Sequence, residues 1–98
     1  MLAGALWRAG WAVSTIPIML AVARAESGCH LGAAHIGREE RSLGPLQINV
    51  AAHRWCTEAC ALSWECSARA ALRIYSDFGL RAWTAYRTGA YLRFYRRR

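Results

Sequence analysis

Arg24-Ala25-Glu26-Ser27-Gly28 places a single carboxylate at the end of an uncharged stretch of sequence. From Ile16 to Ala23 there is no charged residue, and Gly28 is a natural stop for a helix. The carbonyl end of a helix carries partial negative charge, so an acid is disfavoured there. Burial and the helix end would both oppose ionisation of Glu26 and keep it protonated near neutral pH, ready to donate a proton. A surface glutamate at a frayed helix end is the alternative interpretation.

Two helices are expected before and through this stretch. Residues 1–10 predict a short helix that ends at a glycine. A second helix begins after Ser14 or Thr15, has Pro17 in its first turn, where a missing N–H costs nothing, and runs to Glu26. Because it is apolar nearly all round, we expect it to be the central buried helix of the fold.

The same region also resembles a secretory signal, which is a competing interpretation. Arg8 precedes an apolar run from Ala9 to Ala23, and Ala21-Val22-Ala23 or Ala23-Arg24-Ala25 would fit a cleavage site. Polar residues, a glycine and a proline interrupt the run, so a helix that belongs to the fold is favoured over removal of residues 1–23. The run is too short to span a bilayer, which needs roughly 20 apolar residues.

The composition predicts one small globular domain over residues 1–98. Hydrophobic residues make up 55% of the chain and charged residues 19%, which excludes a disordered protein. The net charge of +7 comes from thirteen arginines spread along the chain, apart from the closing Arg96-Arg97-Arg98. Spread positive charge suits any polyanion, whether nucleic acid, anionic lipid or an anionic cell wall. A specific nucleic-acid partner is not expected, because such domains usually cluster their basic residues on one element.

An even number of cysteines in a small chain predicts two disulfides and an oxidising destination, with three possible pairings. The four cysteines are Cys29, Cys56, Cys60 and Cys66. Buried free thiols are the alternative. Zinc is disfavoured despite three nearby histidines, because the C-x3-C-x5-C spacing lacks the paired knuckles of structural zinc sites. No metal or cofactor is therefore expected.

The middle of the chain changes from polar to alternating. Residues 29–43 predict a loop or one short β-hairpin, with Arg38-Glu39-Glu40-Arg41 as its solvated tip. After it, Leu46 and Ile48 alternate with Gln47 and Asn49, so the two amides would point to one side and the aliphatic side chains to the other. Amides there suit hydrogen bonds to a ligand rich in hydroxyl or amide groups, or alternatively they cap neighbouring backbone.

Helices are expected again in the last third. Ser63 can cap a helix from Trp64 to Phe78, whose apolar residues are spaced three and four apart. The predicted apolar face comprises Ala68, Ala71, Leu72, Tyr75 and Phe78. Residues 82–88 predict one more short helix. The expected fold class is therefore mainly α, a small helical domain around a central buried helix with one short β-hairpin.

Three blocks of sequence, taken in their order along the chain, indicate a family: AVARAESG from Ala21 to Gly28, SLGPLQIN from Ser42 to Asn49, and GLRAWTAYRTGAY from Gly79 to Tyr91. Together they resemble the lysozyme superfamily, and most of all its soluble lytic transglycosylase branch. The pair Trp55-Cys56 and the run ECSARAALRIYSDFG also resemble animal-type lysozymes. Each block alone is a weak signal, but the three in order cover most of the chain.

The resemblance implies an α+β lysozyme-like fold and cleavage of the β-1,4 bond between N-acetylmuramic acid and N-acetylglucosamine in peptidoglycan. Glu26 matches the catalytic acid. Gln47 and Asn49 match cleft positions that hydrogen-bond the sugars. Trp83 matches the aromatic residue that packs against the acid, and Tyr86 matches a tyrosine of the cleft.

The chain departs from the family pattern at two positions. Arg87 stands where the family has an asparagine, and Ser42 stands where animal-type lysozymes have an aspartate. Hydrolysis normally needs a second carboxylate, as nucleophile or to hold a water. Ser42 therefore favours transglycosylation, in which Glu26 is first the acid and then the base that closes a 1,6-anhydro ring. Hydrolysis is the alternative if Glu39 or Glu40 turns into the cleft and holds a water.

We therefore predict a monomeric, bacteriolytic muramidase that needs no cofactor or transmembrane segment and acts on the cell wall, outside the cytoplasm or from a phage virion. Two alternatives come from other classes of protein. A non-catalytic glycan-binding module would leave Glu26 idle. A membrane-active or nucleic-acid-binding basic domain would rest on the arginine-rich C-terminus.

Overall fold

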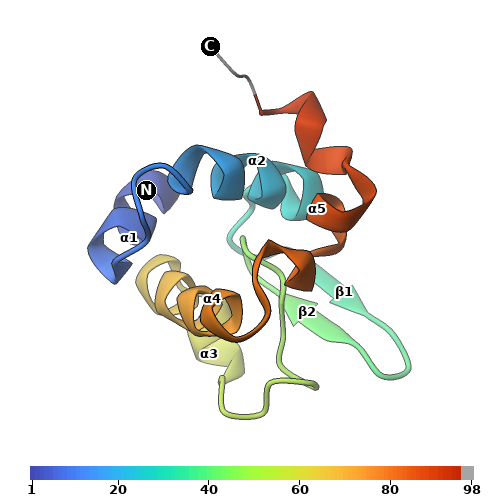
Figure 1. Cartoon of the computed structure of the whole chain (residues 1–98). Helices are drawn as coiled ribbons and strands as arrows, with labels where there is room; N and C mark the ends of the chain where they lie inside the picture. Colours follow the sequence, from blue (N-terminus) through green and yellow to red (C-terminus); the bar gives the residue numbers. More distant parts are fainter. Residues whose placement is uncertain (96–98) are drawn as a thin grey trace.

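Among residues 1–95, five helices form the body of the molecule, and a small sheet extends from one side of it (Figure 1). This computed structural model describes residues 1–95. The alternative of a membrane-active or nucleic-acid-binding domain rests on the closing arginines, which lie outside the described residues. The helices are α1 (Leu2–Ala9), α2 (Ile16–Ser27), α3 (Glu58–Ala61), α4 (Trp64–Phe78) and α5 (Thr84–Thr88), with 3-10 turns η1 (Leu80–Ala82) and η2 (Ala90–Arg93) on either side of α5. The predicted mainly helical, lysozyme-like fold class is confirmed. No helix among residues 1–95 is long and apolar enough to cross a membrane.

The sheet has three short antiparallel strands in the order β1 (Ala34–Ile36), β2 (Arg41–Leu43) and β3 (Ile48–Asn49). The predicted hairpin is β1–β2, and β3 is an addition that the sequence did not predict. A tight turn makes it possible: Gly44 and Gln47 both adopt left-handed backbone angles, and the Gln47 N–H donates to the Gly44 carbonyl. The chain therefore folds straight back after β2 instead of leaving the sheet.

Helix α2 begins and ends where the sequence predicts. Pro17 lies in its first turn, and Gly28 takes a left-handed φ of 66° while its N–H donates to the Arg24 carbonyl. The buried residues of the helix are Met19, Ala21, Val22 and Ala23, whereas Ile16, Ile18, Leu20 and Ala25 are only partly buried against the core. The helix thus reaches the core with one side and delivers Glu26 in its last turn.

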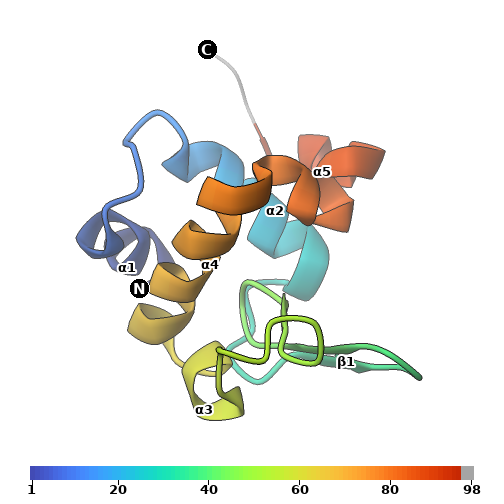
Figure 2. The ribbon, with the colours of Figure 1, turned by 60° about the horizontal axis from the view of Figure 1, so that its bottom comes forward.

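Helices α1 and α4 pack side by side (Figure 2). Trp11 follows α1 and links the two, because its indole Nε1 donates to the Ala68 carbonyl over 3.0 Å and its ring lies 5.0 Å from that of Tyr75. Leu2 and Leu6 of α1 are buried in the same core. Residues 1–23 therefore supply part of the core, which their removal would destroy.

The apolar face of α4 differs in part from the prediction. Ala68 and Ala71 are buried as expected, but Ile74 is buried too, and Phe78 is 62% exposed. Phe78 is the last residue of the helix, beyond the end of the core, where its ring lies 6.2 Å from that of His53. The helical spacing of the buried residues in α4 agrees with the prediction, but the core ends before Phe78.

One disulfide is present where two were expected. Cys60 of α3 and Cys66 of α4 are bonded, whereas Cys29 and Cys56 are free thiols. Cys29 follows the C-terminus of α2 in a left-handed backbone conformation, and Cys56 is buried before α3 with its sulfur directed at the Thr57 carbonyl. For Cys29 and Cys56 the structure therefore agrees with the alternative prediction of free thiols and not with a second disulfide.

Gly44 is the position at which a single methyl group should do most harm to the fold. A Cβ there would lie 1.8 Å from the Ala61 carbonyl oxygen, and the left-handed φ of 80° alone would cost about 1–2 kcal/mol. We expect Gly44→Ala to lower the free energy of unfolding in urea by about 3 kcal/mol or more. Gly32→Ala is the matched control, because nothing lies within 4 Å of its added Cβ. Equal stability of the two variants would contradict the close packing of the turn.

The two free thiols should react slowly in the folded protein. Burial raises the pKa of the Cys29 thiol, which the charge of Arg24 partly opposes, and burial also raises the pKa of the Cys56 thiol. Less thiolate is then present near pH 7, and the thiolate is the reactive form. We expect iodoacetamide to modify two cysteines after unfolding without reduction, and four after reduction, as read by mass spectrometry. Absence of modification in the unfolded, unreduced protein would indicate two disulfides instead.

Candidate active site

A cleft of about 340 Å³ lies where the end of α2, the start of α5 and the sheet meet. Helical segments supply one wall and the sheet the other. The lining residues are Glu26, His35, Glu40, Ser42, Gln47, Ile48, Asn49, His53, Ile74, Ala82, Trp83 and Thr84. Four of the five sequence-predicted site residues are therefore brought together, and Tyr86 is not.

Glu26 lies half-buried in the helical wall and is fixed by the neighbouring helix. Its Oε2 accepts a hydrogen bond of 2.9 Å from the backbone N–H of Ala85, in the first turn of α5. The adjacent Ser27 Oγ lies 2.7 Å from the Pro45 carbonyl oxygen and accepts from the N–H of Cys29, which fixes the end of α2 against the turn after β2. One carboxyl oxygen of Glu26 is thus anchored, and the other is left for the cleft.

Trp83 and Glu26 both line the cleft. It is only 4% exposed, and its indole Nε1 donates to the Leu46 carbonyl over 2.8 Å. The ring supplies an apolar surface beside the carboxyl group. Trp83 therefore also fastens the start of α5 to the turn between β2 and β3.

The side-chain amide of Gln47 forms hydrogen bonds to other groups of the protein. Its Nε2 donates to the carbonyls of Ala33 and Gly44, at 3.3 and 2.9 Å, and its Oε1 lies 2.5 Å from Nδ1 of His35. These contacts favour the alternative in which this amide caps neighbouring backbone. Gln47 shapes the floor of the cleft and orients His35, whose ring faces the same space.

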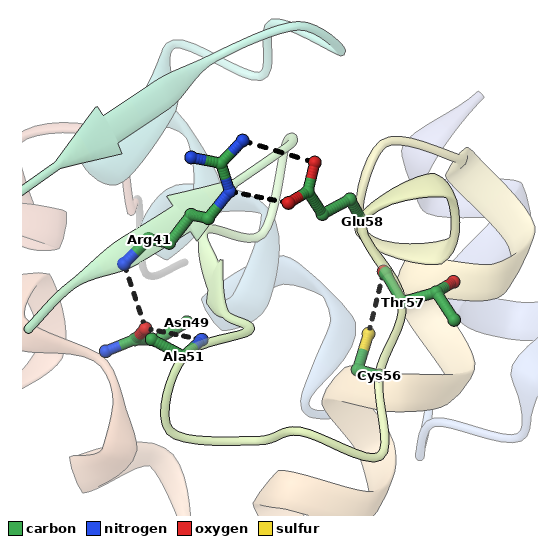
Figure 3. Close-up of polar contacts among 6 residues, drawn as sticks. All are labelled: Arg41, Asn49, Ala51, Cys56, Thr57 and Glu58. Carbon is green, nitrogen blue, oxygen red and sulfur yellow. Dashed lines mark hydrogen bonds and ion pairs between the residues drawn. The ribbon is translucent and has the colours of Figure 1, made fainter.

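Asn49 is oriented differently, as Figure 3 shows. Its Oδ1 accepts from the backbone N–H groups of Arg41 and Ala51, at 3.0 and 3.1 Å, and Arg41 in turn pairs with Glu58 of α3 at 2.7 Å. The oxygen is therefore committed to the backbone. The amide nitrogen remains as a donor for a ligand in the cleft, which keeps Asn49 as a candidate for binding a sugar.

Tyr86 lies outside the cleft. Its ring stacks on Tyr91 at 5.0 Å, and it lines a separate depression with Arg81 and Arg87. Arg87, at the position where the family has an asparagine, donates to the Arg81 carbonyl and over 3.0 Å to Oγ1 of Thr84. This arginine braces the turn into α5, so the departure from the family pattern serves the local structure.

Glu40 lines the cleft as well, so the cleft holds a second carboxylate besides Glu26. The sequence predicts a solvated tip over residues 38–41, and Arg38, Glu39 and Glu40 are all exposed there, but Glu40 also lines the cleft. Ser42 Oγ donates to Glu40 Oε2 over 2.7 Å. Glu40 lies just before β2, and this contact brings its carboxylate to the side of the sheet on which Ser42 lies.

Within residues 1–95, no group of three or more His, Cys, Asp or Glu side chains lies close enough together to hold a metal ion. The groups that line the cleft are thus carboxyl, hydroxyl, amide, imidazole and indole groups of the chain itself.

A helical body, a small antiparallel sheet and a carboxyl group at the end of a helix facing the cleft between them define the class of lysozyme-like glycan-cleaving domains. The chain belongs to this family: the lysozyme-like domain family matches residues 4–85, which include the first two blocks and end in the first turn of α5. No curated protein and no solved structure matches the chain significantly.

Replacing Trp83 should separate its hydrogen bond from its bulk. Trp83→Phe keeps an aromatic ring but leaves the buried Leu46 carbonyl without its donor, which costs about 1–3 kcal/mol. We expect a loss of that size in the free energy of unfolding by urea. Trp7→Phe is the control, because Trp7 is 65% exposed and should change stability little. If both variants are equally stable, the indole does not hold the turn.

Proposed function

We propose that this protein is a muramidase that cleaves the β-1,4 bond between N-acetylmuramic acid and N-acetylglucosamine, with Glu26 as the proton donor. The observation that carries the proposal is the placement of Glu26. The end of α2 directs it into the cleft, and the α5 backbone N–H holds one of its oxygens. Membership of the lysozyme-like family points to peptidoglycan as the glycan.

In this reaction the protonated carboxyl group of Glu26 donates its proton to the glycosidic oxygen. The bond from that oxygen to C1 of the muramic residue breaks, and its electron pair stays on the leaving oxygen. Trp83 keeps water away from one side of the carboxyl group, and the Asn49 amide nitrogen is placed to donate to a sugar substituent. General acid catalysis of this kind contributes about 10²–10⁴-fold to a rate.

Two fates are open to the positive charge that develops at C1. In transglycosylation, the Glu26 carboxylate takes the proton of the 6-hydroxyl of the same sugar, whose oxygen closes a 1,6-anhydro ring. That route needs a single carboxyl group, and the feature in its favour is the serine at position 42, where animal-type lysozymes have an aspartate. Hydrolysis is the second candidate, and the specific observation in its favour is Glu40, which also lines the cleft.

The substrate also suits the charge of the protein. A net charge of +7 attracts an anionic polymer such as a bacterial wall over a range set by ionic strength. Action on that wall places the protein outside the cytoplasm or on a virion when it works. Positive charge brings the enzyme to the polymer, whereas the cleft selects the bond.

Glu26→Gln tests the proposed function. Glutamine keeps the size of the side chain and can still accept from the Ala85 N–H, so the fold and melting temperature should be unchanged. The variant cannot donate a proton, and clearing of cell walls in a zymogram or turbidity assay should fall about 100-fold or more.

Asp77→Asn is the matched control. It removes the same charge from an exposed residue that does not line the cleft, and it should clear walls as the parent does. Full activity of Glu26→Gln would show that another group is the acid. Inactivity of the parent protein on every peptidoglycan tested, with sugar binding retained, would favour the glycan-binding module.

A further inference from the structure

We propose that Glu40 is the second carboxylate of this cleft, that Ser42 positions it, and that it makes water the acceptor of the cleaved strand. The inference rests on the proposed function, which it refines from glycan cleavage to hydrolysis. Ser42 occupies the position at which animal-type lysozymes have an aspartate. In this chain the missing carboxylate is supplied from two residues upstream.

The register of the sheet explains how Glu40 reaches the cleft. Ser42 pairs with His35 of β1 on one side and with Asn49 of β3 on the other. Directly paired residues of antiparallel strands project to the same face, and all three of these residues line the cleft. Glu40 directly precedes β2, and its carboxylate lies on the same side of the sheet as Ser42, because the Ser42 hydroxyl group reaches it.

A hydrogen bond then fixes the carboxylate. Ser42 is only 6% exposed, and its Oγ donates to Oε2 of Glu40 over 2.7 Å. The backbone of Glu40 is held as well, because its carbonyl accepts from the N–H of Gly37 over 2.8 Å. One oxygen of the carboxylate is thus held by a hydroxyl group, and the other is available to a water or a sugar.

Neighbouring charges leave Glu40 free for this role. The adjacent Arg41 could have paired with it, but its guanidinium group makes two hydrogen bonds to Glu58 of α3 instead, at 2.7 and 3.2 Å. Glu39 and Glu40 are both exposed, but Glu40 lines the cleft and Glu39 does not. Of the two consecutive glutamates, the structure therefore assigns the role to Glu40.

The two carboxyl groups approach the cleft from different walls. Glu26 comes from the end of α2 and Glu40 from the sheet, so a glycan strand lying in the cleft would have one on each side. Separated carboxyl groups with a water between them are what a general acid and a general base require.

The reaction balances as follows. Glu26 gives its proton to the glycosidic oxygen, and the C1–O bond breaks with its electron pair on that oxygen. A water oxygen bonds to C1 while one proton of the water passes to the Glu40 carboxylate. Exchange with solvent then removes the proton from Glu40 and returns one to Glu26. The net change is the addition of one water across the bond, which leaves a reducing muramic end.

Product analysis tests the proposal. Purified peptidoglycan is digested with the whole protein, the fragments are reduced with borohydride, and mass spectrometry counts reducible muramic ends against 1,6-anhydro ends, which borohydride does not change. We expect the parent protein to give mainly reducible ends. Glu40→Gln should form them about 100-fold more slowly, and the share of anhydro ends should rise, because the 6-hydroxyl then competes better with water.

Three further variants control the result. Glu39→Gln removes the neighbouring charge and should leave rate and products as in the parent. Ser42→Ala should lower the yield of reducible ends severalfold, whereas Ser42→Thr keeps a hydroxyl group and should restore most of it. A purely structural serine would change stability but not the ratio of products.

The outcomes distinguish this inference from the proposed function. Mainly anhydro ends from the parent protein, or unchanged products from Glu40→Gln, would overturn the role of Glu40 while leaving Glu26 as the acid. Full activity of Glu26→Gln would overturn the proposed function itself. Loss of cleavage in Glu26→Gln together with a shifted product ratio in Glu40→Gln supports both.

Discussion

The turn of residues 44–47 is the constraint on which the rest of the structure depends. Its four residues meet four different parts of the chain. Gly44 lies against the Ala61 backbone, the Pro45 carbonyl faces the Ser27 hydroxyl, the Leu46 carbonyl accepts from Trp83, and the Gln47 amide reaches the Ala33 carbonyl. The end of α2, the start of α5, α3 and the hairpin are therefore positioned by one short segment, and the cleft is the space left between them.

Local patterns in the sequence predicted the elements well, for reasons that are local themselves. Pro17, Gly28 and Ser63 act within a few residues of where they stand, so the limits of α2 and the start of α4 followed from them. The resemblance to a known family then predicted Glu26 as the candidate acid. Two features could not be predicted from the sequence: the end of the core before Phe78 and the pairing of the cysteines. Both depend on contacts between residues that are distant in sequence.

The candidate site shows the same division. Glu26 and Trp83 lie together because two helix ends converge, and the three blocks of sequence were enough to expect this. The roles of the amides were not predictable, since Gln47 and Asn49 alternate alike in sequence but have different partners in space. Tyr86 was misplaced because its stacking on Tyr91 depends on a turn whose direction the sequence does not reveal.

The hairpin that carries Glu40 has little burial along its outer strand. Strand β1 buries none of its three residues, and Ile36 remains open to solvent. A segment with so few buried contacts opens at a lower free energy than the whole domain unfolds. The outer edge of the sheet, where β1 lies, is therefore the side of the cleft that gives way most easily to a bulky, cross-linked polymer.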